Sequence, residues 1–139
     1  MTSGRPAVSD DWSAYAFGQD GVFAELKSAV ENSLSKAGLM LFMHLDQGAV
    51  LQKETGQDTP RIIRLLIGNP LIMKEMAKHV PDAGSYAPVT VLVDERPDGV
   101  HLSYDRMASF LRPYGNAEAL KVAKDLDAKV EVLLASAAA

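Results

Sequence analysis

The sequence predicts one α+β domain in which a single mixed β-sheet, with a C-terminal hairpin, is covered by amphipathic helices. The chain has 139 residues and 47% hydrophobic content, which suits one core. Short apolar runs typical of strands alternate with segments of helical periodicity. The turn Arg96-Pro97-Asp98-Gly99 between two alternating segments predicts an antiparallel hairpin. The predicted order is β-α-β-α-β-α-β-β-α-α.

The first third of the chain predicts two strands and two helices. Residues 1–10 are expected to form a flexible tail, and residues 11–139 the domain. We expect a short strand over 12–17 and a helix from Asp20 that ends at Gly38, which can take the left-handed conformation. The apolar run over 39–45 predicts a buried central strand. Asp46 is expected to cap a short helix after it.

The segment from Arg61 to Asp82 predicts a strand that turns directly into a helix. Residues 62–67 are almost continuously apolar, as in a strand covered on both faces. Asn69 can accept a hydrogen bond from a free first-turn amide, and Pro70 has no N–H to leave unpaired. A helix is therefore expected to begin at this turn.

The last third predicts the hairpin and two helices. Val89, Val91 and Val93 alternate on one face of a strand, and residues 100–104 form the return strand. A short helix is expected over 105–111, and a long one from about Asn116. Four charged residues are expected on the solvated side of the long helix: Lys121, Lys124, Asp127 and Glu131.

Composition excludes several classes of protein and site. With 14 basic and 18 acidic residues, the net charge of -4 has the wrong sign for holding nucleic acid phosphates. The absence of cysteine excludes disulfides, thiolate metal sites and cysteine nucleophiles. No apolar run reaches the roughly 18 residues that span a bilayer. We expect a soluble, cytoplasmic protein without a cofactor, a metal site, or a nucleic acid or membrane partner.

His44 and Asp46 are the first candidate site. A histidine at the end of a strand lies where open sheets often bind ligands, and Asp46 can orient it as a general base. The alternative is a histidine that bonds to a loop carbonyl.

Two further candidates concern ligand binding. The Gly68-Asn69-Pro70 turn places free amides at a helix N-terminus, which is either an anion site or an ordinary cap. Aromatic and arginine residues are either walls of a pocket for an anionic or aromatic ligand, or half-buried anchors. They are Tyr86, Tyr104, Tyr114, Arg106 and Arg112.

The order of these features resembles the domain of unknown function 302 family of bacteria and archaea. The resemblance covers about residues 20–135. It is carried by Met43-His44, by Ile67-Gly68-Asn69-Pro70 with Met73 and Met76 in the helix after it, by residues 87–93, by Asp98-Gly99 and by Ser103-Tyr104. It implies a compact α+β domain, often oligomeric, with no established reaction.

The sequence favours a non-catalytic domain that binds a small molecule or a protein and self-associates, most simply as a homodimer. The expected ligand residues are His44, Gly68, Asn69, Tyr86, Tyr104 and Arg106. The alternative is an enzyme that uses His44 as general acid/base, with Asp46 or Asp105 orienting it and an anion held at the Gly68 turn. A third hypothesis is metal binding through histidine and methionine.

Overall fold

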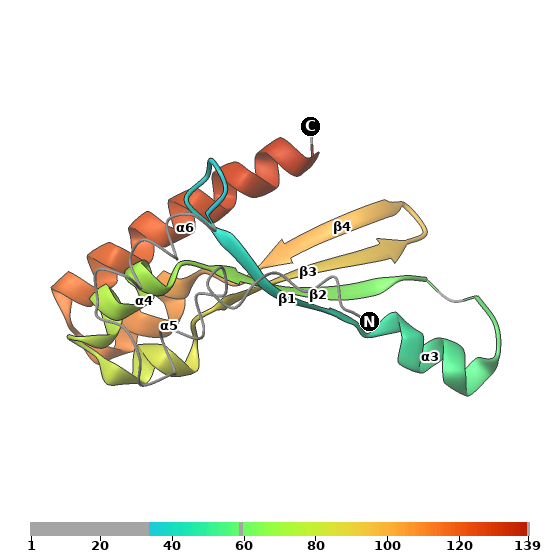
Figure 1. Cartoon of the computed structure of the whole chain (residues 1–139), viewed down its shortest axis with the longest axis horizontal. Coiled ribbons are helices and arrows are strands. Elements are labelled where there is room, and N and C mark those ends of the chain that lie inside the picture. The colour runs from blue at the N-terminus through green and yellow to red at the C-terminus, as the bar shows by residue number, and fades with distance from the viewer. Residues whose placement is uncertain (1–33, 59, 139) are drawn as a thin grey trace, which may run out of the picture.

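The computed structural model describes residues 34–58 and 60–138, which fold around a four-stranded antiparallel sheet in the order β1-β2-β3-β4 (Figure 1). The strands are β1 (Met40–Asp46), β2 (Ile62–Gly68), β3 (Val89–Arg96) and β4 (Gly99–Tyr104). The α+β class and the element order after the first helix are confirmed. The predicted strand over 12–17 and most of the helix from Asp20 lie outside the described residues. The helix was expected to reach Gly38, but residues 34–37 form a loop and turn instead, so its predicted end is wrong.

All three strand pairings are antiparallel, where a mixed sheet was expected. The connections give the reason. The helix between β1 and β2, α3 (Gly48–Thr55), lies beyond the end of β1 instead of crossing back over the sheet (Figure 1). The chain therefore re-enters the sheet in the opposite direction, and a parallel neighbour would have needed a crossover.

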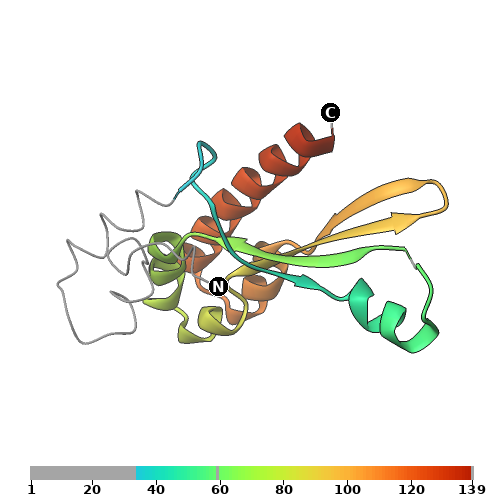
Figure 2. The ribbon, with the colours of Figure 1, turned by 45° about the vertical axis from the view of Figure 1, so that its right-hand side comes forward.

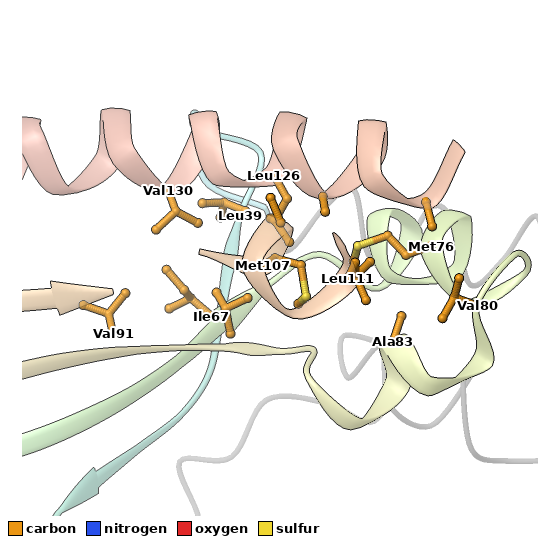
Figure 3. Close-up of a cluster of buried hydrophobic side chains, with 14 residues drawn as sticks. Leu39, Ile67, Met76, Val80, Ala83, Val91, Met107, Leu111, Leu126 and Val130 are labelled. Carbon is orange, nitrogen blue, oxygen red and sulfur yellow. The ribbon is translucent and has the colours of Figure 1, made fainter. Parts of the chain in front are cut away.

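The other helices begin at the opposite end of the sheet from α3 and the β3–β4 hairpin, and the longest of them runs back beside β4 (Figure 2). They are α4 (Pro70–Ala77), η2 (Pro81–Ser85), α5 (Met107–Leu111), η3 (Arg112–Tyr114) and α6 (Ala117–Ala138). Figure 3 shows the core between α6 and the sheet, with Met76, Met107 and Val130 fully buried. Ile67 and Val91 supply the sheet's side of this core.

The strand predicted as buried and central, β1, is instead at the edge of the described sheet. Leu41 and Met43 are 55% and 52% exposed, and only Met40 is buried. A register shift between Leu41 and Met43 marks a bulge, as edge strands often have. An apolar run of this length fits either position, and the pairing partners that decide between them are not encoded locally.

Asp127 lies in the core, so its predicted place on the solvated side of α6 is wrong. Its side chain is 5% exposed. It accepts hydrogen bonds from the Tyr104 hydroxyl at 2.6 Å and from the amides of Met107 and Ala108 at 2.7 and 3.0 Å. The N-cap residue of α5, Arg106, makes no side-chain cap. Asp127 therefore caps α5 from the neighbouring helix, where its negative charge is favourable.

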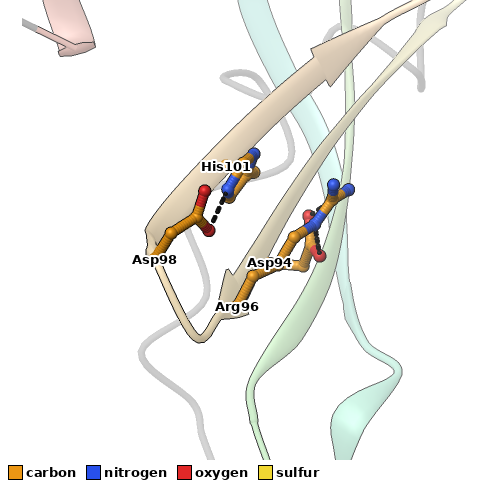
Figure 4. A network of polar contacts seen from close by, with 4 residues as sticks. All are labelled: Asp94, Arg96, Asp98 and His101. Atoms are coloured by element: carbon orange, nitrogen blue, oxygen red, sulfur yellow. Dashed lines mark hydrogen bonds and ion pairs between the residues drawn. The ribbon is translucent and has the colours of Figure 1, made fainter.

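The predicted hairpin is confirmed, and two polar pairs lie at its turn (Figure 4). The Arg96 Nε lies 2.7 Å from Asp94 Oδ2, and the His101 Nε2 lies 2.7 Å from Asp98 Oδ1. The hydrogen bond from His101 lowers the pKa of Asp98. Gly99 has a φ of 130°, which other residues rarely adopt.

Candidate functional site

The Gly68-Asn69-Pro70 turn is a doubly anchored helix cap. The Asn69 Oδ1 accepts from the Leu71 amide at 2.9 Å, as predicted. Its Nδ2 donates to the Gly38 carbonyl at 3.1 Å, which ties the segment before β1 to the start of α4. Gly38 has the expected left-handed φ of 78°. Because the asparagine oxygen already occupies a first-turn amide, the geometry favours the capping interpretation over an anion site.

A cavity of about 410 Å³ lies beside this turn, and its walls are mainly apolar. We call it the apolar cavity. Its lining comes from β1, from the β2–α4 turn and α4, from the segment around Pro88, and from α6: Phe42, Gly68, Asn69, Pro70, Leu71, Met73, Lys74, Met76, Gly84, Ala87, Pro88, Val89 and Leu126.

The charged residue of the apolar cavity is Lys74, which is ion-paired with Glu75. Glu75 also pairs with Lys78 at 2.7 Å. Hydrogen bonds from Lys74 and Lys78 lower the pKa of Glu75 to about 2. The lysine charge at the cavity is therefore balanced by a carboxylate that stays ionised, and the walls favour a ligand without charge.

A second cavity, of about 450 Å³, opens on the face of the sheet away from α6. We call it the Arg64 cavity. Its lining is more polar: Arg64, Ser85, Tyr86, Pro88, Val89, Thr90, Leu92, Ser103, Tyr104, Asp105 and Phe110. Pro88 and Val89 line both cavities, so the two adjoin at this short segment.

The aromatic wall of the Arg64 cavity is a fixed stack. The rings of Tyr86 and Phe110 are 5.0 Å apart and nearly parallel, at 12°. The Tyr86 and Tyr114 hydroxyls lie 2.9 Å apart, and the Tyr114 hydroxyl donates to Asp82 at 3.2 Å. Tyr86 must therefore be the donor between the two tyrosines.

The pocket candidates Tyr104 and Arg106 lie in different surroundings. Tyr104 lines the Arg64 cavity, while its hydroxyl donates to Asp127 of α6. Burial, and then this bond, raise the pKa of Tyr104. Arg106 pairs with Glu131 at 2.7 Å on the surface and lines neither cavity. The arginine that does line one is Arg64, which was not among the predicted site residues. The sequence does indicate a polar position here, because Arg64 interrupts an apolar run. On a strand its side chain points to the face opposite that of its neighbour Leu65, which faces the core.

His44 and Asp46 do not form a pair. His44 lies opposite Leu65 on the edge strand, its ring makes no hydrogen bond to another described residue, and it lines neither cavity. The Asp46 carboxylate accepts from the Ala49 amide at 3.2 Å, which confirms its predicted capping role. Among the residues that the structure describes, no group of three or more histidine, aspartate or glutamate side chains is placed to hold a metal ion.

Comparison with known proteins identifies the family. The model of the family described as "Domain of unknown function DUF302" matches residues 18–137. The chain belongs to this family. The crystal structure of an uncharacterized conserved DUF302 protein from Bacillus stearothermophilus is similar to this DUF302 domain, with a TM-score of 0.64 and 13% identity. The match covers 81% of this chain and 88% of that one, and it shows a shared fold.

No curated protein matches the sequence. In the part of the chain that the structure describes, no helix is both long and apolar enough to cross a membrane.

Proposed function

We propose that this DUF302 domain is a non-catalytic binding domain whose ligand is a small, neutral, apolar molecule held in the apolar cavity. The observation that carries the proposal is the cavity itself. Its volume of about 410 Å³ falls within the usual range for small-molecule sites, and such sites are mostly apolar with a few polar groups. Transfer of apolar ligand surface from water to these walls supplies the driving force.

The position of the apolar cavity also supports this role. It is bounded by the Asn69 cap and by the fully buried Met76, which belong to the rigid part of the fold. A site on such elements is largely preformed, so less binding free energy is lost in ordering it. The methionines at its wall, Met73 and Met76, adapt to the shape of an apolar ligand.

Gly68 offers a direct test of this proposal. A Cβ at this position would lie 3.7 Å from Pro88 and 3.8 Å from the Phe42 ring, which is ordinary van der Waals contact. Gly68→Ala should therefore fold normally, and Gly68→Leu adds three further carbons toward the same walls. The control is Ala117→Leu, because Ala117 is exposed at the start of α6 and outside the apolar cavity.

The probe is N-phenyl-1-naphthylamine, a neutral apolar dye that fluoresces when it leaves water. Wild type and Ala117→Leu should bind it with the same affinity, Gly68→Ala more weakly, and Gly68→Leu about tenfold more weakly or worse. A tenfold loss corresponds to about 1.4 kcal/mol. Equal affinity in Gly68→Leu, or no saturable binding by the wild type, would contradict the proposal.

A second candidate role is self-association, and the exposed edge strand β1 supports it. β1 pairs only with β2 among the described strands, and it exposes Leu41, Met43 and Leu45. Edge strands of this kind are ready to pair with another strand. Two antiparallel copies of β1 about a twofold axis would give a self-complementary interface, so the partner is a second copy of this chain.

The test compares Met43→Lys with Val132→Lys by analytical ultracentrifugation. Met43 is on β1, whereas Val132 is 68% exposed on α6. Wild type and Val132→Lys should sediment as dimers and Met43→Lys as a monomer. A monomeric wild type, or a Met43→Lys variant that remains dimeric, would exclude this interface.

The enzyme alternative, with His44 as general acid/base, has less support from the geometry because His44 lines neither cavity. His44→Ala should leave binding of the dye unchanged. If His44→Ala lost binding of the dye or an activity of the protein, His44 would have to be part of the functional site.

A further inference from the structure

The geometry points to a second, independent binding site. We propose that the Arg64 cavity takes an organic monocarboxylate with an aromatic body, whose carboxylate is received by the Arg64 guanidinium. This site does not depend on a ligand in the apolar cavity, because Arg64, Tyr86 and Phe110, which define it, do not line that cavity.

Arg64 is a cation that no carboxylate of the described chain balances. The ion pairs within residues 34–58 and 60–138 involve other side chains, and Arg64 is half-buried in β2. Its Nε donates to the Thr90 hydroxyl at 2.9 Å, which fixes the direction of the guanidinium. Nε is thus used, and the two terminal nitrogens remain for a ligand. A planar fork of two N–H donors matches the two oxygens of a carboxylate.

The walls around Arg64 define the rest of the ligand. The Tyr86–Phe110 stack and the side chains of Leu92 and Pro88 offer flat apolar surface beside the charge. The hydroxyl bond from Tyr86 to Tyr114 holds the stack in place, so an aromatic ligand packs against a preformed wall.

Asp105 restricts the charge of the ligand. It also lines the Arg64 cavity, and it is exposed. The Arg64 guanidinium receives one carboxylate, and a second negative charge on the ligand would be repelled by Asp105. The site therefore favours monoanions over dianions such as phosphate monoesters.

The experiment measures binding by amide chemical shifts in two-dimensional NMR, with 3-phenylpropanoate and its neutral amide, 3-phenylpropanamide, as probes. The variants are Arg64→Gln and Arg64→Lys, and the control is Arg61→Gln, which removes the same charge from an exposed position just before β2. The wild type should bind the carboxylate about tenfold or more tightly than the amide.

Arg64→Gln should weaken carboxylate binding about tenfold or more and leave amide binding unchanged, while Arg64→Lys should retain part of the affinity. Arg61→Gln should behave as wild type. Phenyl phosphate should bind more weakly than 3-phenylpropanoate. Equal binding of acid and amide, or an Arg64→Gln variant with wild-type affinity, would overturn the proposal.

Crossed variants separate this site from the apolar cavity. Gly68→Leu should bind 3-phenylpropanoate as wild type does, and Arg64→Gln should bind N-phenyl-1-naphthylamine as wild type does. If Gly68→Leu abolished binding of both probes, the two cavities would form one site, and the independent Arg64 site would be refuted.

Discussion

Replacement of Asp127 by asparagine tests how the buried carboxylate joins α6, α5 and β4. Asp127 accepts three hydrogen bonds, from the Tyr104 hydroxyl and from the amides of Met107 and Ala108. Asparagine has nearly the same shape but only one acceptor oxygen. Its NH2 group must therefore face one of these donors, and the negative charge at the N-terminus of α5 is lost.

The expected loss of stability follows from these bonds. A buried donor that loses its acceptor costs about 1–3 kcal/mol. The two bonds that survive change from a charged to a neutral acceptor, which costs about 0.5–1 kcal/mol each. Part of this cost is recovered by local relaxation, so Asp127→Asn should lower the free energy of unfolding by about 2–4 kcal/mol. Tyr104→Phe removes only one donor and should cost about 1 kcal/mol.

Urea denaturation followed by circular dichroism measures the effect. The control is Glu131→Gln, which removes a charge from the same helix in an exposed pair with Arg106 and should change stability by less than about 0.5 kcal/mol. Similar midpoints for Asp127→Asn and Glu131→Gln would refute the capping role of Asp127.

Three further predictions concern the cap and the titrating groups. Asn69→Ala should lower the free energy of unfolding in urea by about 1–2 kcal/mol, because it removes the cap of α4 and the bond to Gly38. The raised pKa of Tyr104 stabilises the fold below about pH 10 and ceases to do so as the pH rises further, so the melting temperature of the wild type should fall more steeply above about pH 10 than that of Tyr104→Phe. The lowered pKa of Glu75 stabilises the fold above about pH 4.5, and this contribution disappears as the pH falls toward 2. A carboxyl NMR titration should show a Glu75 midpoint near 2, and this midpoint should rise in Lys74→Gln.

Local signals made much of the fold predictable. Asn69 and Pro70 encode the start of α4 within a few residues, and Pro97 and Gly99 encode the hairpin turn. Each signal acts through the backbone of neighbouring residues, so no tertiary information was needed. Gly38 has the predicted left-handed conformation, but it lies in a turn and not directly after a helix.

The features that failed depend on tertiary contacts. Whether β1 is central or at the edge is decided by pairing partners far along the chain. Asp127 lies four residues after Ala123 and three before Val130, both fully buried, so its spacing placed it beside the apolar stripe of α6. Its charge predicted exposure to solvent, and only the hydrogen-bond donors from β4 and α5 make the buried position favourable.

The candidate site was predictable in part. Gly68, Asn69, Tyr86 and Tyr104 line the two cavities, but they divide between them. Arg106, predicted as a ligand residue, pairs with Glu131 on the surface. It lies beyond the end of β4, at the start of α5, so the strand pattern does not decide where its side chain lies.

The most direct test of the central claim is to map bound N-phenyl-1-naphthylamine on the full chain by amide chemical shifts. The account predicts saturable shifts concentrated at residues of the apolar cavity, such as Gly68, Asn69, Met73 and Val89, and their loss in Gly68→Leu. Shifts centred on α3 or on the β3–β4 turn, or unchanged shifts in Gly68→Leu, would contradict it.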